Sequence, residues 1–254
     1  MKDQILFGRL GNKTNDIKYF KESLPLDIKN IVEPFGGTFS LSRIIYNDEK
    51  YNIFVNDTDT DLYEIYKKPE EYSNYCIEMN NYAIKNKTLK NGIKVDYNNF
   101  IKEIQDNKMN NNESFYKIWR ENNIIRGTFI KTKKEINHKK CLDFMKNITF
   151  SNDDYLNCIE KHRKIKDTFI FLDPPYLFSN NIQYKEQGEK ADTTEIIYKI
   201  YELMKDKKTK AKIMFIINDL MILRWLFKDF IKGEYKKIYQ IGKREDNHLI
   251  ICNY

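Results

Sequence analysis

The chain has 254 residues, of which 41% are hydrophobic and 32% are charged, with 44 basic against 37 acidic side chains. This length accommodates one α/β domain, or a core with a smaller inserted lobe. No apolar stretch reaches the roughly 18 residues of a membrane span, and the first residues lack a continuous apolar signal segment, so we expect neither a membrane protein nor a secreted one.

Cysteine and histidine lack the spacing of a metal site. Neither type shows the paired pattern of zinc ligands, and the cysteines do not form a disulfide framework. The residues concerned are Cys76, Cys141, Cys158, Cys252, His138, His162 and His248. The sequence therefore predicts an intracellular protein in a reducing compartment, without a metal.

The first third of the chain alternates predicted strands and helices. Residues 26–35 predict a strand that ends at Pro34, followed by a glycine turn and a helix near 39–46. Residues 51–56 predict a second strand. In the stretch that follows, one helical face is formed by Leu62, Ile65 and Tyr66.

The second half continues the same alternation. Strands are predicted at residues 146–150, 167–172, 210–217 and 249–253. Between the second and third of these, apolar residues recur at helical spacing: Ile196, Ile197, Ile200, Leu203 and Met204. Such alternation implies an α/β sheet with helices on both faces.

Residues 67–145 interrupt this pattern, because they are helical in pattern, polar and basic. They hold 16 basic and 10 acidic residues, and so carry six of the seven net positive charges. A charged run is usually a solvated face, but the interleaved aromatics Phe115, Tyr116, Trp119 and Phe129 favour a nucleic-acid surface. We interpret 67–145 as an inserted lobe, and 1–66 with 146–254 as the main domain.

Two predicted strand ends carry residues suited to a ligand, and such ends are where open α/β sheets bind ligands. The turn Gly36-Gly37 lets the backbone approach a ligand closely, although a simple strand–helix connection is the commoner explanation. Asp57 follows twenty residues later, where an acid can accept both hydroxyls of a ribose. An isolated Asp at that place is more often a helix N-cap.

A third strand end is the most specific. The apolar run 169–172 stops at Asp173-Pro174-Pro175-Tyr176. A plain turn is one explanation, because proline punctuates strand ends. Yet two of only five prolines stand here, beside an acid and an aromatic residue, which favours an active-site motif.

In this order the motifs resemble those of the Dam-like (D12 class, alpha group) DNA adenine-N6 methyltransferases, which use S-adenosylmethionine. The resemblance runs along nearly the whole chain. FGRLGNK (7–13) resembles the opening cofactor motif, VEPFGGTFS (32–40) the FxGxG loop, VNDTDTDLYEIY (55–66) the ribose-binding segment and ITFSNDDY (148–155) the segment that meets the cofactor's adenine. FLDPPY resembles the catalytic motif, and FIINDLMILRWLF (215–227) and HLIICNY (248–254) match the closing strands.

The resemblance implies a Rossmann-like methyltransferase sheet, with the lobe 67–145 recognising target DNA. The catalytic residues that it implies are Asp173, Pro174, Pro175 and Tyr176. The implied cofactor-binding residues are Phe7, Arg9, Lys13, Glu33, Pro34, Phe35, Gly36, Gly37, Thr38, Asp57, Asp153, Asp154, Tyr155 and Asp173. Candidate contacts to double-stranded DNA are Arg120, Asn122, Arg126, Lys131, Lys133 and Lys134, with ordinary surface arginines as the rival explanation.

These residue types suit the reaction. The amino nitrogen of adenine is a poor nucleophile, because its lone pair is delocalised into the ring. The Asp173 carboxylate and the main-chain carbonyl at Pro174 are acceptors for its two hydrogens, and the prolines add no competing N–H donor. Tyr176 offers a stacking face to a base that has been flipped out of the duplex.

Some positions depart from the family and leave rival functions open. Phe39 replaces the second glycine of the FxGxG loop, Arg9 stands where an aromatic is usual, and Ile130 stands at an expected Asn. RNA adenine-N6 methylation needs identical chemistry. A pseudoenzyme that binds nucleic acid without turnover is favoured by Phe39 and opposed by the intact Asp-Pro-Pro-Tyr. Glutamine methyltransferases begin the motif with Asn, which Asp173 disfavours.

Overall fold

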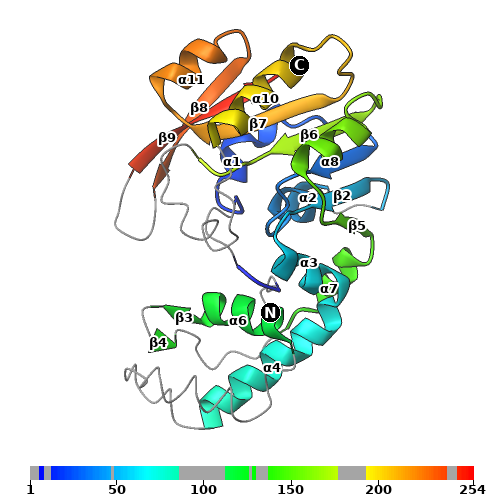
Figure 1. The fold of residues 1–254 in the computed structure, drawn as a ribbon, viewed down its shortest axis with the longest axis vertical. Coiled ribbons are helices and arrows are strands. Elements are labelled where there is room, and N and C mark those ends of the chain that lie inside the picture. Colours follow the sequence, from blue (N-terminus) through cyan, green and yellow to red (C-terminus); the bar gives the residue numbers. More distant parts are fainter. Residues whose placement is uncertain are drawn as a thin grey trace.

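A seven-stranded sheet, with strand order β5-β2-β1-β6-β7-β9-β8, occupies the upper part of the molecule in Figure 1. The computed structural model describes residues 6–8, 13–46, 49–85, 112–125, 128–129, 137–176, 193–238 and 245–254. Within these ranges, no helix combines the length and the apolar composition that crossing a bilayer requires.

The sheet is parallel except at one edge. The parallel strands are β1 (Asn30–Glu33), β2 (Asn52–Asn56), β5 (Ile148–Ser151), β6 (Thr168–Leu172) and β7 (Lys212–Asn218). The strands β9 (Glu245–Cys252) and β8 (Ile231–Ile238) are antiparallel to their neighbours. The predicted strands are confirmed, but β1 is shorter than 26–35, because its pairing with both β2 and β6 begins at Asn30.

The closing part of the chain corrects the sequence interpretation. Residues 215–227 are not all strand: β7 ends at Asn218, and Met221–Leu226 form the helix α11. The strand β8 was not predicted, because its sequence IKGEYKKI is mostly polar. Charged residues are usual on a strand at the edge of a sheet, where they discourage pairing with another chain.

Helices cover both faces of the sheet, as predicted. Along β6, Phe169 and Phe171 enter one buried cluster while Ile170 and Leu172 enter the other, because successive side chains of a strand point to opposite faces. The first cluster includes residues of α1 (Ile17–Phe20), α2 (Ser40–Ile45) and α3 (Thr60–Lys67). The second includes residues of α8 (Tyr155–His162), α10 (Thr193–Lys205) and α11.

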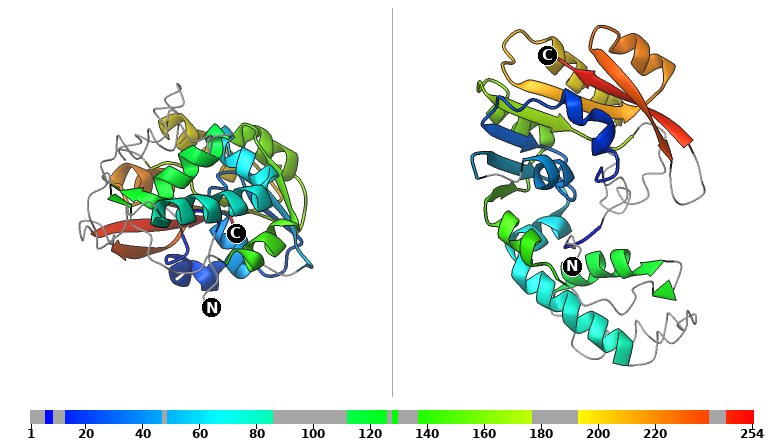
Figure 2. Two further views of the ribbon diagram at one scale, coloured as in Figure 1. Left: turned by 90° about the horizontal axis from the view of Figure 1, so that it is seen from below. Right: turned by 180° about the vertical axis from the view of Figure 1, so that it is seen from behind.

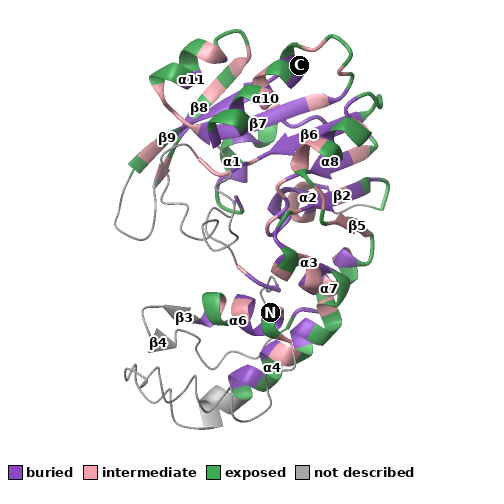
Figure 3. Cartoon of the chain, in the orientation of Figure 1, coloured by how far each residue is buried: buried purple, intermediate pink, exposed green. Residues whose placement is uncertain are grey.

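The predicted apolar helix faces are buried (Figure 3). In α3 they comprise Leu62, Ile65 and Tyr66, and in α10 they comprise Ile196, Ile197, Ile200, Leu203 and Met204. Between α1 and β1 lies the short 3-10 turn η1 (Lys21–Ser23). Burial on both faces of the parallel strands fixes their register, and so sets which residues stand at their carboxyl ends.

Residues between α3 and β5 form a separate group of elements. They are α4 (Pro69–Lys85), α6 (Glu113–Asn123), the two-stranded pair β3 (Ile124–Ile125) and β4 (Thr128–Phe129), and α7 (Lys139–Met145). Figure 2 shows α4 and α6 extending away from the sheet, beyond its β5 edge. This is the region predicted as an inserted lobe.

Three of the four aromatic residues that favoured a nucleic-acid surface are buried instead, which corrects the sequence interpretation for them. Phe115, Tyr116 and Trp119 of α6 are buried. The Phe115 ring meets Tyr72 of α4 at 5.2 Å between centroids, and the Trp119 Nε1 donates to the Asn80 Oδ1 at 3.3 Å. These rings fill the core between α4 and α6, and the side chain of Phe129 lies outside the described part.

Candidate active site at the strand ends

The loop after β1 requires glycine at Gly36. A Cβ atom there would lie 2.3 Å from the Val55 Cγ1 and 2.9 Å from the Asn56 main-chain oxygen. The Gly36 N–H also donates to that oxygen at 2.7 Å. The loop therefore lies directly against the end of β2.

Gly37 differs, because its φ is +48° and no atom of the described residues lies within 4 Å of the position a Cβ would take. Positive φ favours glycine. Its main-chain oxygen accepts a hydrogen bond from the Tyr66 hydroxyl, and its N–H donates to the Asp57 Oδ2 at 2.8 Å. The glycine thus leaves open space beside a loop that is anchored on both sides.

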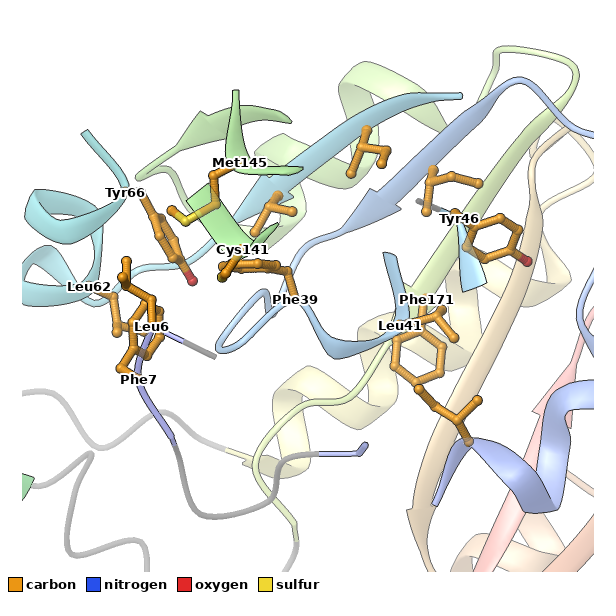
Figure 4. Close-up of a cluster of buried hydrophobic side chains, with 14 of the residues drawn as sticks. Leu6, Phe7, Phe39, Leu41, Tyr46, Leu62, Tyr66, Cys141, Met145 and Phe171 are labelled. Carbon is orange, nitrogen blue, oxygen red and sulfur yellow. The ribbon is translucent and has the colours of Figure 1, made fainter. Parts of the chain in front are cut away.

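Phe39 has a left-handed backbone conformation, with φ 40° and ψ 42°. This is a conformation that glycine adopts without penalty, while other residues incur a cost of about 1–2 kcal/mol. Its ring is 2% exposed and meets the rings of Phe7, Tyr66, Phe144 and Phe150 at centroid distances of 5.9–6.4 Å. Figure 4 shows Phe39 among the buried side chains that include Phe7, Tyr66 and Met145, so its ring is directed into the core.

Asp57 stands at the end of β2 and is not the N-cap of the next helix. The N-cap of α3 is Asp59, whose side chain accepts from the N–H groups of Asp61 and Leu62. The Asp57 carboxylate accepts from Gly37 N on one oxygen and from Asp59 N, at 3.0 Å, on the other. It is half-buried, and it connects the glycine loop to the start of α3.

Asn56 joins three strand ends, and sequence reasoning missed it. Its Nδ2 donates to the Pro34 and Asp153 main-chain oxygens at 3.2 and 2.9 Å. Its Oδ1 accepts from Ser151 Oγ at 2.7 Å and from Asp153 N at 2.9 Å. This fully buried amide ties together the ends of β1, β2 and β5. The available signal was a polar residue closing an apolar strand.

Glu33 ends β1 and is buried. Its Oε1 accepts from Ser42 N at 2.9 Å and from the Ser42 hydroxyl. Burial raises the pKa of Glu33 to about 7, against the opposing effect of the Ser42 hydrogen bonds. Thr38, also buried, shares a 2.7 Å hydrogen bond with Ser40. Both side chains bind residues at the start of α2, so they fix the shape of the loop between β1 and α2.

The segment after β5 supplies a stacked pair of rings. Tyr155 and Phe35 stack at 5.1 Å between centroids, with 28° between their planes. Asp154 caps α8 by accepting from Leu156 N at 2.8 Å. Asp153 is paired with Lys161 at 2.6 Å, and this contact lowers the pKa of its carboxyl. The rings therefore lie at the same edge of the sheet as the glycine loop.

Asp173 directly follows β6 and is bound by Lys13. The Lys13 Nζ lies 2.6 Å from each carboxylate oxygen of Asp173, and 5.1 Å from the centre of the Tyr176 ring. Burial raises the pKa of Asp173, and the Lys13 charge opposes that rise. Burial lowers the pKa of Lys13, but Asp173 and Tyr235 outweigh it, so the pKa is raised overall and Lys13 keeps its proton.

Four more residues lie around this pair and were missed. Lys237 of β8 binds the Asp16 Oδ2 at 2.5 Å. The His248 ring of β9 stacks on Tyr235 of β8 at 5.2 Å and meets Tyr176 at the same distance. Burial, with the charges of Lys13 and Lys237, lowers the pKa of His248 to about 4, so the ring is neutral. Sequence gives no local signal for contacts between such distant positions.

The predicted DNA-contacting residues are only partly described. Asn122 of α6 accepts from Gly8 N at 2.5 Å and donates to the Ile118 main-chain oxygen at 2.7 Å, so its amide joins the N-terminal segment to α6. Arg120 is exposed. Arg126, Lys131, Lys133 and Lys134, and the predicted cofactor residue Arg9, lie outside the described residues. Phe7 is buried against Tyr66 and Tyr72.

The strand order, with five parallel strands and an antiparallel hairpin at one edge, is that of a Rossmann-like methyltransferase. A sequence profile of the D12 class N6 adenine-specific DNA methyltransferases matches residues 10–246. The chain belongs to this family, and it is therefore an enzyme that methylates adenine N6 in DNA. Membership of a methyltransferase family also implies a cofactor of the S-adenosylmethionine type.

Individual relatives are distant. The Type II methyltransferase M.CviBI of Paramecium bursaria Chlorella virus NC1A is 22% identical over 284 residues, which cover 96% of this chain and 97% of that protein. Two solved structures are similar at 8% identity over 97% of this chain. They are a human methyltransferase 10 domain containing protein, with a TM-score of 0.40 over 83% of its chain, and a delta-N METTL16 MTase domain, with a TM-score of 0.41 over 84%.

Proposed function

We propose that Asp173-Pro174-Pro175-Tyr176 holds a flipped-out adenine of double-stranded DNA while its N6 receives a methyl group. The observation that carries this proposal is the place of Asp173. It follows β6, next to the glycine loop after β1, and both of its oxygens accept from the Lys13 ammonium. A charged acceptor therefore stands where ligands of open α/β sheets bind.

The residues at the strand ends fit S-adenosylmethionine. The open space at Gly37 lets a ligand approach the backbone, and the half-buried Asp57 stands twenty residues on, at the end of the neighbouring strand. Carboxylate oxygens accept hydrogen bonds, so Asp57 is the type of acceptor that ribose hydroxyls need. Phe35 and Tyr155 offer apolar surface for the cofactor's adenine.

The other predicted cofactor-binding positions have supporting roles in this proposal. We assign Glu33, Pro34, Gly36 and Thr38 the role of shaping the loop, because their described contacts run to α2 and β2. Asp153 and Asp154 are bound within the segment that leads into α8, and so position Tyr155. Phe39 leaves the loop unobstructed in this proposal, since its ring lies in the core.

Asp173 and the Pro174 carbonyl would hold the two amino hydrogens of adenine and favour a tetrahedral nitrogen. The Asp173 carboxylate retains acceptor sites beyond those that Lys13 occupies. Bound S-adenosylmethionine supplies a methyl carbon activated by its sulfonium. With the cofactor bound, the methyl group would pass from sulfur to the amino nitrogen, sulfur would keep the electron pair of the broken bond, and Asp173 or water would take the amino proton that leaves. Catalysis is mainly positioning and electrostatic support.

Residues 67–145 are proposed to recognise the target DNA. Their charge excess supports this, because neutralising phosphates releases counterions and gives affinity that falls steeply with salt. The exposed Arg120 and the sequence positions Arg126, Lys131, Lys133 and Lys134 are the candidates. The buried aromatics of α6 support the lobe from within, so we assign base stacking to Tyr176 instead.

A methyl-transfer assay tests the proposal. Labelled S-adenosylmethionine is supplied with mixed-sequence duplex DNA or RNA, and the products are identified as nucleosides by mass spectrometry. We expect N6-methyladenine in DNA with wild type, and a loss of about 100-fold or more with Asp173→Ala. The variant should keep its DNA affinity and its fold, but it should unfold more easily than wild type, because Lys13 loses its buried partner. Label in RNA alone would contradict the proposed substrate, and an active Asp173→Ala would contradict the proposed site.

A DNA-binding titration over a range of salt addresses the lobe. The triple variant Lys131→Ala, Lys133→Ala and Lys134→Ala should bind DNA more weakly, with a salt slope smaller by up to about 0.9 per lysine. A matched triple variant at Lys205, Lys207 and Lys208, which are exposed around the end of α10, is the control. Equal slopes for the two triple variants would remove these lysines from the interface.

A further inference from the structure

We propose that the Asp16–Lys237 ion pair is a positioning device for the reaction, in which Lys237 neutralises Asp16 and so leaves the Lys13 ammonium to Asp173. This inference rests on the proposed role of Asp173. Neither Asp16 nor Lys237 touches the reacting atoms in this account; they act through Lys13.

The four charges form an alternating row. Asp173 binds Lys13 at 2.6 Å, and Asp16 binds Lys237 at 2.5 Å. One turn of backbone holds Lys13 of the first pair beside Asp16 of the second. In this turn, Asp16 N and Ile17 N both donate to the Lys13 main-chain oxygen, at 2.8 and 3.0 Å. The Asp16 charge acts on both Lys13 and Asp173, raising the pKa of each.

Burial makes this balance important. The side chains of Lys13, Asp16 and Lys237 are 3%, 5% and 12% exposed, and that of Asp173 is 21% exposed. A buried charge is costly without a partner, and removing one member of a buried pair leaves the other uncompensated. If Lys237 lost its charge, Asp16 would be a buried anion three residues from Lys13, in the same turn. The Lys13 ammonium would then be shared between two carboxylates.

Sharing Lys13 would weaken the acceptor edge of Asp173. The Lys237 charge itself also lowers the pKa of Asp173. Without Lys237, Asp173 would therefore take up a proton at higher pH, and a protonated carboxyl cannot accept on both oxygens. Activity would be lost as the pH falls through this raised pKa.

The other titratable groups that face Asp173 have to be separated from this effect. Tyr235 of β8 has its pKa raised by burial, and His248 of β9 has its pKa lowered by burial, so both are neutral around pH 7. Tyr176 belongs to the motif itself. Glu33 of β1 interacts with Asp173 and has its pKa raised to about 7 by burial. The pH profiles are therefore compared in a Glu33→Gln background as well.

The test is the pH dependence of kcat for four variants. Lys237→Met should move the acid limb upward by about one pH unit, and Asp16→Asn should move it downward, because it leaves Lys237 as an uncompensated cation. The double variant Asp16→Asn/Lys237→Met and the charge-conserving Lys237→Arg should stay close to wild type. Lys236→Met is the control, because Lys236 is an exposed neighbour on β8.

A merely structural role of the ion pair would impair both single variants alike. Shifts of the acid limb that are opposite in the single variants and cancel in the double variant therefore support the proposed role. Two single-variant shifts in the same direction would overturn the inference, and so would an unshifted Lys237→Met. If Lys237→Met does not fold, the comparison of Asp16→Asn with the double variant still tests the inference. Asp16→Asn should move the acid limb downward, and the double variant should not move it.

A second readout keeps this inference distinct from the proposed function. In protein labelled with ¹³C at the aspartate carboxyl carbon, the chemical shift follows the titration of Asp173, with Asp173→Asn assigning the resonance. The pKa of Asp173 should rise in Lys237→Met and fall in Asp16→Asn without cofactor or DNA. A wild type inactive on both nucleic acids would refute the proposed function while this titration still tested the charge row.

Discussion

Glu33, which is buried, and Asp173, whose side chain is 21% exposed, are carboxylates at the ends of neighbouring strands, and they are held by different kinds of donor. Glu33 accepts from the neutral N–H and hydroxyl groups of Ser42, whereas Asp173 accepts from the Lys13 ammonium on both oxygens. Burial raises the pKa of both, and it raises that of Glu33 to about 7. The partner therefore sets the role of each carboxylate: Glu33, held by neutral donors, can take up a proton, and Asp173, held by an ammonium, is a charged acceptor.

Removing the partner of each carboxylate tests this difference directly and should give the largest change in unfolding free energy. Lys13→Met leaves the partly buried Asp173 without its cation, which costs about 3 kcal/mol of unfolding free energy, the lower end of the range for a buried pair. Ser42→Ala removes one neutral donor from Glu33 and should cost about 1 kcal/mol. Denaturant unfolding at pH 8 measures both.

The loss in Lys13→Met should shrink at low pH, because a protonated Asp173 no longer carries an unpaired charge. Equal losses in the two variants, or a loss in Lys13→Met that does not depend on pH, would contradict the distinction between the two carboxylates. Lys199→Met, a substitution of a lysine on α10 that is paired with Glu202 on the surface, controls for loss of a lysine as such.

Glu33 by itself should make the stability of the protein depend on pH. Its folded pKa of about 7 lies above the ordinary value of 4.5, so the native state keeps a proton that the unfolded chain has lost. Its contribution to stability is present below pH 4.5 and is lost as the pH rises to 7, at about 1.4 kcal/mol per pH unit. Glu33→Gln should remove this slope.

The measurement is the difference in unfolding free energy between wild type and Glu33→Gln across that pH range. Because all other groups titrate in both proteins, the difference isolates Glu33. A constant difference would mean that Glu33 keeps its charge throughout, and the serine-held carboxylate would then resemble Asp173 after all.

Asp57 adds a third carboxylate to the comparison and gives the smallest effect. It is half-buried and held by two backbone N–H groups, so its removal should leave the fold nearly unchanged. Asp57→Ala should weaken S-adenosylmethionine binding about tenfold, or about 1.4 kcal/mol, by calorimetry. Asp27→Ala, which removes an exposed partner of Lys212, is the control. Unchanged cofactor affinity would refute the ribose role.

Much of the fold followed from short patterns in the chain. The apolar strands and the buried helix faces were predictable because burial of one face imposes a period of two or 3.6 residues. The motif at Asp173 was predictable for a related reason, since prolines and an acid interrupt a fully buried strand. The strand β8 escaped this reasoning because an edge strand carries polar side chains on positions that the pattern expects to be apolar.

The sequence by itself determined the kinds of residue at the strand ends, and with them the family and the reaction. Only the tertiary structure decided their partners. Lys13 reaches Asp173 across 160 positions, and Lys237 reaches Asp16 across 221. The tertiary structure also directs the aromatic rings of α6 and the ring of Phe39 into the core. Local patterns depend on neighbours along the chain, whereas an ion pair between such distant residues depends on strand order, which only the packed sheet establishes.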